Sequence, residues 1–301
     1  MRRQIQAWRA TERESAMKLD KAHDFVIRPD AIPADQSGIL ISVTPEHAGW
    51  DTLGFSVCRL EKGEVWREST GDDEVAIVLL GGKATIDWGE GPRPIGRREH
   101  VFSGYPYCVY LPRGASFELH AETLAEFTES RVRSRLKGEP HLFTPPDLGC
   151  EIRGSGDTTR QIVRIIRPEF AADKLMVNEV YTPGGNWSSF PPHKHELNDP
   201  PHESDLDELY YFRMDHPDGF ALLRVYKSDG ARDVTVTIHD GDLALLREGY
   251  HLVAAPPGCN VYYQAVLAGP VRSLAASVDP RYARMHDASP NPDPRIPIIG
   301  R

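Results

Sequence analysis

The chain has 301 residues, 40% of them hydrophobic, which is enough apolar material for one large domain or two of ordinary size. Its net charge of −9 gives no overall basic face for nucleic acid or an anionic membrane. No apolar run approaches the roughly eighteen residues of a membrane span, and no signal-peptide hydrophobic region begins the sequence. We therefore expect a globular, cytoplasmic protein that binds small metabolites.

The opening of the chain, MRRQIQAWRATERESA, is rich in arginine and has no sustained apolar pattern. We expect residues 1–23 to form an N-terminal extension without a function of its own. The cysteines are widely spaced, form no CxxC pair, and are interpreted as reduced thiols: Cys58, Cys108, Cys150 and Cys259.

From about residue 38 onward, short β-branched or aromatic runs alternate with Gly, Pro and Asp turns. Examples are EVAIVLLGG, KATIDW, YCVYLP, KLMVNEVY, FALLRVY, DVTVTIHDGD and NVYYQAVLAG. Many short strands at regular spacing predict an all-β sandwich or barrel, and the chain length predicts two of them.

The two halves repeat one order of features: a strand that begins with Glu, a Gly turn, a second strand, and an apolar run that ends in a Gly-containing corner. This order is typical of a cupin, a small jelly-roll barrel. We expect two cupin barrels in tandem, over residues 24–155 and 156–301. The boundary is expected in the polar, Gly-rich segment 149–160.

The segment PPHKHE contains two histidines, His193 and His195, one residue apart. In a strand, residues i and i+2 face the same way, so both imidazoles can reach one metal ion. The pair alone is weak evidence, since roughly half of random sequences with twelve histidines in this length contain an HxH. The surrounding pattern must therefore support the site.

That support comes from Glu208, which begins the strand-like run ELYYF, and from His251, which follows an apolar strand and a Gly corner. Three histidines and one glutamate from successive strands form the cupin ligand set. Asp199 is a rival carboxylate ligand at a shorter spacing, but it precedes two prolines, which disfavour a paired strand. We favour Glu208.

The first half lacks the corresponding histidines. It has EVWREST where the histidine pair would stand and Phe117 where the late histidine would stand, although Glu74 and Gly81 keep the strand–turn spacing. We predict that the first barrel binds no metal and serves packing or dimerisation, which makes a homo-oligomer possible.

Several segments of the second half resemble the 5-deoxy-glucuronate isomerase family of myo-inositol catabolism. They are PPHKHE, DELYYFR, GFALLRVY, DGDLALLREGYHLVAAPPG, VYYQAVLAGP and DPRYARMHDASPNPDP. The resemblance runs from about residue 24 to the end and is densest over 180–295. It implies a bicupin that converts 5-deoxy-D-glucuronate to 5-dehydro-2-deoxy-D-gluconate, with a metal bound by His193, His195, Glu208 and His251. Arg247 departs from the proline usual before the Gly corner, but it removes no ligand.

The 5-keto-4-deoxyuronate isomerase family is similar in architecture and ligand set, but its glutamate follows the histidines more closely. The long insert ELNDPPHESDLD therefore favours the inositol branch. Two further functions stay open for such a ligand set. One is a non-catalytic cupin that binds a sugar acid, and the second is a cupin dioxygenase that holds iron.

An aldose–ketose isomerisation moves hydrogen from C2 to C1 and develops charge on oxygen. A divalent ion with open coordination positions would act as Lewis acid and template. Since no redox change is needed, we expect Zn or Mn, while Fe or Ni would fit the same mixed nitrogen and oxygen ligands.

Arg224, inside an otherwise apolar strand, is the first candidate to bind the substrate carboxylate. The competing interpretation is an edge-strand arginine with its head in water. Alternation turns Arg213 and Lys194 away from the ligand-bearing face. Tyr262, with its neighbour Tyr263, lies in a strand expected to cross the barrel and is a candidate catalytic residue, although such pairs are more often core.

His202 and Glu203 belong to the acidic insert, which is a candidate lid over the barrel mouth or, alternatively, a solvated loop.

Overall fold

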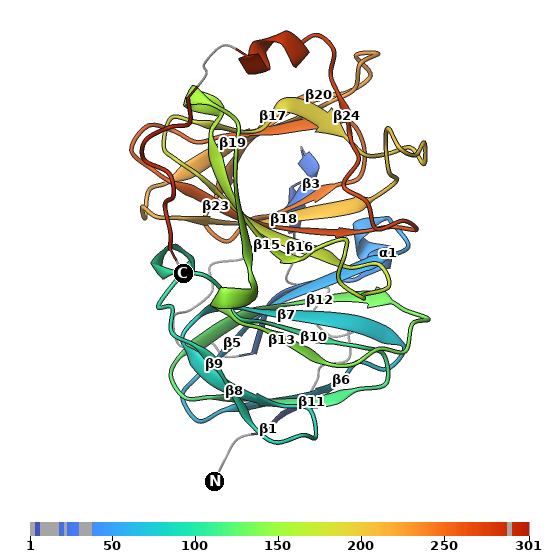
Figure 1. Ribbon diagram of the computed structural model, residues 1–301, viewed down its shortest axis with the longest axis vertical. Coiled ribbons are helices and arrows are strands. Elements are labelled where there is room, and N and C mark those ends of the chain that lie inside the picture. Colours follow the sequence, from blue (N-terminus) through green and yellow to red (C-terminus); the bar gives the residue numbers. More distant parts are fainter. Residues whose placement is uncertain (1–3, 7–17, 21–22, 30–37, 288–290, 301) are drawn as a thin grey trace.

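The computed structural model describes residues 4–6, 18–20, 23–29, 38–287 and 291–300. Within these residues, strands dominate. Helical structure is confined to α1 (Pro45–Ala48), η2 (Val101–Ser103), η3 (Pro145–Asp147), η4 (Gly156–Thr158) and η5 (Ala283–Asp287). No helix in the described part of the chain is long and apolar enough to cross a membrane. Figure 1 shows two β-barrels stacked along the long axis of the molecule, which confirms the all-β prediction.

The lower barrel in Figure 1 consists of two sheets that enclose an apolar interior. The first sheet has the order β1 (Gln4–Gln6), β6 (Val65–Ser69), β11 (Ser116–Ala121), β8 (Lys83–Asp87) and β9 (Arg93–Gly96). The second has the order β13 (His141–Phe143), β10 (Cys108–Leu111), β7 (Asp73–Gly81), β12 (Ala125–Arg133), β5 (Leu53–Leu60) and β4 (Gly38–Val43).

The upper barrel is built from an eight-stranded and a five-stranded sheet. The larger has the order β14 (Gly149–Arg153), β15 (Arg160–Ile166), β16 (Met176–Thr182), β23 (Val261–Ala268), β18 (Asp207–Met214), β21 (Leu243–Leu246), β3 (His23–Arg28) and β2 (Lys18–Asp20). The smaller has the order β20 (Asp233–His239), β19 (Phe220–Tyr226), β22 (Tyr250–Ala254), β17 (Trp187–Lys194) and β24 (Ser277–Val278).

Two strands that fall largely within the first barrel expected at residues 24–155 depart from that division, and β2 of the expected extension joins the same sheet. β3 pairs with β21, where Ile27 lies opposite Leu243, and β14 pairs with β15. Both β3 and β14 therefore belong to the large sheet of the upper barrel, because a strand can pair with a partner that is far away in the chain. Of the predicted extension 1–23, the structure describes only β1, β2 and the start of β3, and the rest lies outside the described residues.

The central strands of the eight-stranded sheet, such as β16, β18 and β23, are buried on both faces. Side chains such as Tyr210 and Tyr263 point into the upper barrel, whereas their neighbours Tyr211 and Tyr262 pack against the lower barrel. The ring centroids of Tyr211 and Phe55, on a strand of the lower barrel, lie 6.0 Å apart. Strands with two buried faces read as nearly continuous apolar runs, which explains why the sequence alternation is weak here.

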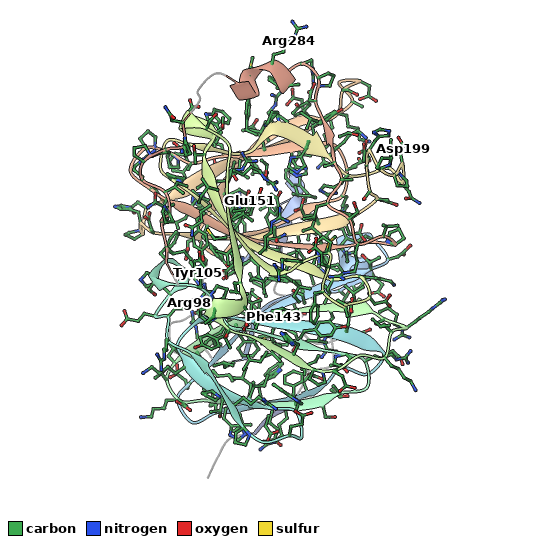
Figure 2. The ribbon with its side chains drawn as sticks, in the orientation of Figure 1. Arg98, Tyr105, Phe143, Glu151, Asp199 and Arg284 are labelled. Atoms are coloured by element: carbon green, nitrogen blue, oxygen red, sulfur yellow. The ribbon has the colours of Figure 1, made fainter. Side chains whose placement is uncertain are left out.

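A buried ion pair joins the two barrels. The Arg98 guanidinium, labelled between the barrels in Figure 2, lies 2.7 Å from the Glu179 carboxylate, and both side chains are almost fully buried. Tyr181 and Tyr262 donate hydrogen bonds to the same carboxylate, over 2.7 and 2.9 Å. Glu74 makes a second link, since it accepts the backbone N–H groups of residues 173–175. The Glu74 side chain is therefore a structural acceptor between the barrels.

Candidate metal centre

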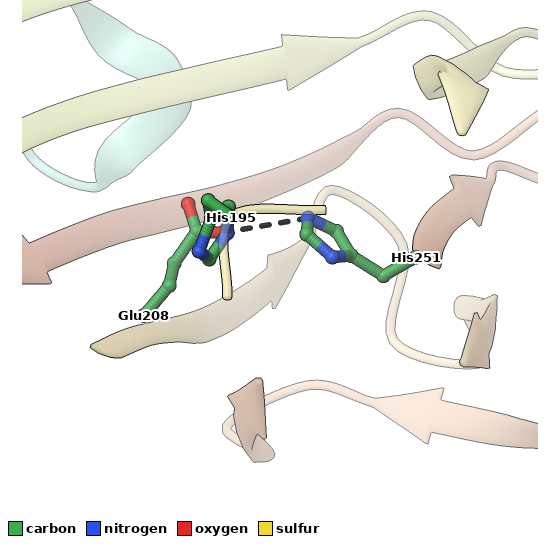
Figure 3. Close-up of side chains that lie close together, drawn as sticks. All are labelled: His195, Glu208 and His251. Carbon is green, nitrogen blue, oxygen red and sulfur yellow. Dashed lines mark hydrogen bonds and ion pairs between the residues drawn. The ribbon is translucent and has the colours of Figure 1, made fainter. Parts of the chain in front are cut away.

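Three of the predicted ligands meet inside the upper barrel. His195 follows β17, Glu208 lies near the start of β18, and His251 lies in β22, where its register partner is His193. Ligand atoms of His195, Glu208 and His251 all lie within 4.8 Å of one another, and all three side chains are buried. Figure 3 shows the His195 ring against the Glu208 carboxylate, with the His251 ring directed toward them. This trio is a possible three-residue metal site.

The Glu208 carboxylate lies between the two imidazoles. Its Oε2 is 2.7 Å from His195 Nε2 and 3.4 Å from His251 Nε2. His195 Nδ1 lies 2.9 Å from the Leu206 carbonyl oxygen and donates to it, which directs the other ring nitrogen at the cluster. Metal-bound histidines commonly have such a carbonyl partner.

His251 provides a direct test of whether a metal fits. Its Nε2 is buried and makes no well-directed hydrogen bond within the described residues. An unpaired buried nitrogen that faces a carboxylate is unfavourable unless something else binds it. Two imidazole nitrogens and a carboxylate oxygen are ligands that Zn and other first-row transition metals accept. The residues present therefore fit a divalent metal ion.

The electrostatics keep the carboxylate ionised. Burial by itself would raise the pKa of Glu208, but the charge and hydrogen bond of His195, with a further contribution from the charge of His251, hold that pKa well below its usual range. Desolvation, together with repulsion from His251 and His195, lowers the pKa of His193 well below the usual value. At neutral pH Glu208 is anionic and His193 is neutral, which are the states that bind metal.

His193 borders the trio without joining it. Its ring centroid lies 4.6 Å from that of His251 and 6.2 Å from that of His195, but its nitrogens lie outside the compact group of ligand atoms. Asp199, the rival carboxylate, lies exposed in a loop at the side of the upper barrel (Figure 2). The structure thus brings Glu208 rather than Asp199 to the histidines.

A cavity of about 100 Å³ opens beside the cluster and is lined by polar groups that the sequence analysis did not select. Arg160 is the most informative of them. Its guanidinium is buried, has no carboxylate partner among the described residues, and donates through Nη1 to the carbonyl oxygens of Thr158 and Phe190, 3.0 Å away in each case. Desolvation lowers its pKa to about 10, so it stays charged at neutral pH. A buried cation of this kind is suited to bind an anionic ligand group.

Two tyrosines form another wall of the cavity. The rings of Tyr210 and Tyr263 lie 4.4 Å apart, and the Tyr263 hydroxyl shares hydrogen bonds with Ser188 over 2.5 Å and with Ser189 over 3.3 Å. Burial raises the pKa of both phenols. They therefore remain protonated at neutral pH and act as hydrogen-bond donors.

The structure places neither predicted catalytic residue at this cavity. Tyr262 points into the core between the barrels, because Tyr263 is the residue of this pair that faces inward in β23. Arg224 lies on the outer face of β19, since its register partner is Leu252, the neighbour of His251. There it forms a two-pronged ion pair with Asp233, over 2.8 and 2.7 Å, and covers the ring of Tyr226.

The remaining polar candidates have structural partners. Glu203 is buried, and it accepts from Lys194 Nζ over 2.9 Å and from the backbone N–H groups of Glu196 and Leu197. The acidic insert is thereby tied to the strand that carries the histidines. Arg213 forms ion pairs with Glu126 and Asp240, and His202 is exposed.

Comparison with known proteins identifies the group to which the chain belongs. A sequence model described as the KduI/IolB family matches residues 25–285. The chain belongs to the KduI/IolB family. Two curated relatives, both named 5-deoxy-glucuronate isomerase, come from Geobacillus kaustophilus and Bacillus velezensis. They are 42% and 36% identical over 82% and 85% of this chain, and 90% and 96% of their own lengths. The predicted resemblance is confirmed, and this member of the KduI/IolB family is an isomerase.

Solved structures agree on the fold. An IolB-like protein from Salmonella typhimurium superposes with a TM-score of 0.83 at 32% identity, covering 87% of this chain and 98% of its own. A Bacillus subtilis oxalate decarboxylase with Mn(II) centres gives a TM-score of 0.58 at 14% identity, over 81% and 76% of the two chains. At that identity the second likeness shows the cupin fold alone. The cupin architecture predicted for this family member is confirmed.

Proposed function

We propose that this KduI/IolB-family isomerase is a metal-dependent aldose–ketose isomerase that converts 5-deoxy-D-glucuronate to 5-dehydro-2-deoxy-D-gluconate in myo-inositol catabolism. One observation carries the proposal: His195 and Glu208, two members of the trio, line the same cavity as Arg160, a buried cation without a carboxylate partner among the described residues. A substrate with a carboxylate at one end and an aldehyde beside a hydroxyl at the other needs both features. The names of the curated relatives supply the substrate.

Four residues would hold the metal: His195, Glu208, His251 and, as the fourth, His193, whose ring adjoins that of His251. A bound divalent ion would supply Lewis acidity to the carbonyl and hydroxyl oxygens of the substrate. Zn and Mn are the first choices because the reaction needs no redox change, and Fe or Ni suit the same ligands.

The protein groups around the metal would orient the sugar acid. Arg160 would pair with the substrate carboxylate through the guanidinium nitrogens that it does not use for Thr158 and Phe190. The protonated phenols of Tyr210 and Tyr263 would donate hydrogen bonds to substrate oxygens, including one on which negative charge develops. Neither phenol serves as the base, since burial raises both pKa values.

Replacement of Arg160 by lysine is expected to raise KM by roughly 10- to 100-fold, because a charge-assisted hydrogen bond is worth about 1.5–3 kcal/mol. Lysine keeps the charge but loses the planar fork. Arg224→Lys is the matched control, and its KM should stay unchanged because that arginine pairs with Asp233 on the outer face. Steady-state kinetics of the two variants show which of the two arginines binds the substrate carboxylate. A larger rise in KM for the Arg224 variant would instead indicate that Arg224, on the outer face of β19, binds the substrate carboxylate.

The reaction itself is tested by incubating metal-loaded protein with 5-deoxy-D-glucuronate and following the ketose by NMR. We expect conversion with this substrate and little or none with 5-keto-4-deoxyuronate. Binding without conversion would instead indicate a sugar-acid-binding protein, and preference for the second substrate would indicate the related isomerase. Oxygen consumption by an iron-loaded sample would support a dioxygenase.

A further inference from the structure

The lower barrel contains a cavity of its own, about 880 Å³ in volume, bordered by α1, β4, β5, β6 and β12. It shares no lining residue with the cavity beside the metal cluster. Its inner wall is the barrel interior: Glu129 and Arg131 continue the alternating face of β12 that carries the core residue Phe127, and Glu68 continues the face of β6 that carries Trp66. The mouth of a β-barrel is a common place for a small-molecule site.

Two buried polar atoms on this wall have no protein partner. Trp66 is 3% exposed, and its indole Nε1–H makes no hydrogen bond within the described residues. Glu129 is 6% exposed; its Oε1 accepts from the Arg131 Nε, but its Oε2 has no partner in the same set. The unpaired donor and the unpaired acceptor thus belong to two side chains that line the same cavity. Buried polar groups of native proteins are normally paired, so both atoms are candidates to bind a partner from outside the chain.

The charges around the cavity limit what the partner is. Five carboxylates face two guanidinium groups, a net charge of −3: Glu46, Asp51, Glu68, Asp73 and Glu129 against Arg131 and Arg133. Arg131 is already shared among Glu68, Asp73 and Glu129. A sugar acid would therefore meet repulsion here, in contrast to the cavity with Arg160. The acidic residues do not make a metal site either, since the trio of the upper barrel is the sole cluster of that kind in the described part of the chain.

We propose that the first barrel holds a second binding site, for a neutral polyhydroxylated molecule of sugar size. A hydroxyl group is both acceptor and donor, so adjacent hydroxyls on one ring satisfy the indole N–H of Trp66 and the free carboxylate oxygen of Glu129 together. The site is separate from the metal centre and does not depend on the isomerase assignment.

Calorimetric titration of the full-length protein with myo-inositol, D-glucose and D-glucuronate tests the proposal. At least one neutral probe should bind in the presence and absence of metal, and more tightly than D-glucuronate does in the metal-free protein. Trp66→Phe, which removes the indole N–H together with the five-membered ring, should weaken that binding by about three- to tenfold, the equivalent of one hydrogen bond. Isomerase activity of this variant should stay at the wild-type level.

Trp88→Phe is the matched control. Trp88 also lies in the first barrel and also has an unpaired buried indole nitrogen, but it does not line the cavity. Binding of the neutral probe should be unchanged in this variant. Glu129→Gln provides a second test should Trp66→Phe fold poorly. If the amide oxygen still accepts from Arg131, an amide nitrogen replaces the free Oε2 and cannot accept a hydrogen bond from the ligand, so we expect weaker binding there too.

Three results would overturn the proposal. They are absence of binding by both neutral probes, equal weakening in the Trp66 and Trp88 variants, or competition between the neutral probe and the isomerase substrate. None of these results bears on whether the upper barrel isomerises 5-deoxy-D-glucuronate, so failure of this site and failure of the proposed function remain distinguishable.

Discussion

Substitution of His251 by alanine is expected to lower both metal affinity and turnover by at least roughly 100-fold, more than the loss of a residue that only supports a metal ligand. His251 Nε2 is buried, lacks a hydrogen bond in the described residues and faces the Glu208 carboxylate at 3.4 Å. Without it, the trio loses one of its two imidazole nitrogens and keeps only His195 and Glu208. Elemental analysis after dialysis against trace metal, together with the isomerase assay, measures both effects.

Thermal unfolding gives a readout that does not need substrate. A metal that binds only the folded protein raises its stability in proportion to the logarithm of ligand excess, so added Zn or Mn should raise the melting temperature of the wild type. That rise should shrink strongly in His251→Ala and persist in His239→Ala, a control whose side chain is exposed at the end of β20. Full activity and normal metal content in the His251 variant would refute the ligand assignment.

Replacement of Arg98 by methionine is expected to destabilise the protein by about 3–5 kcal/mol, because it leaves the Glu179 carboxylate buried without its cation. The two side chains are 2% and 0% exposed, and their ion pair lies in the core between the barrels. Tyr181 and Tyr262 still donate to the carboxylate, but neutral hydroxyls do not replace the charge. Chemical denaturation, followed by circular dichroism, measures the change in free energy of unfolding.

Arg224→Met is the matched control for this experiment. The Arg224–Asp233 pair has the same 2.7 Å separation, but its side chains are 31% and 53% exposed. A solvent-exposed pair contributes about 0–1 kcal/mol, so this variant should unfold almost like the wild type. The double variant Arg98→Met, Glu179→Leu should recover much of the lost stability, since an apolar pair needs no desolvation. Equal losses at the two arginines would contradict the role assigned to the buried pair.

The proposed binding site would give the first barrel a role beyond packing or dimerisation. The sequence predicts a barrel without metal that serves packing or dimerisation. In the structure, Trp66 and Glu68 lie on the side of β6 that faces the barrel interior. The mouth of this barrel is a cavity, although its described residues include no cluster of metal-binding side chains. A barrel of this kind can bind a ligand through hydrogen bonds alone.

Local sequence patterns were enough to predict the fold class and to select candidate metal ligands. The regular spacing of strand-like runs predicts the all-β fold, because alternation and turn residues are local properties of the chain. The histidine pair, Glu208 and His251 could be selected as ligands because few other residue types bind transition metals, and the structure gathers three of the four.

The sequence could not show which face of its strand each side chain occupies. Tyr262 and Tyr263 are adjacent, so one of them had to point into the barrel, but only the pairing of Phe212 with Tyr263 in the sheet decides which. Likewise, Arg224 lies opposite Leu252 and so faces outward, away from His251. Since a strand has two faces and a shift of one residue exchanges them, the choice depends on the register with a partner far away in sequence.

Arg160 is a cavity residue that no pattern in the sequence gave reason to select. It alternates with Ile162 and Arg164 along β15, a pattern that signals a strand with one mixed polar face, yet nothing local distinguishes that face from solvent. Only the assembled sheet, with Arg160, Tyr263 and Glu208 on one wall, turns it into a buried cation beside the metal ligands. The sequence by itself determined the strands and the kinds of ligand; the tertiary structure decided which neighbours share a cavity, because pairing over long sequence separations sets the face of every strand.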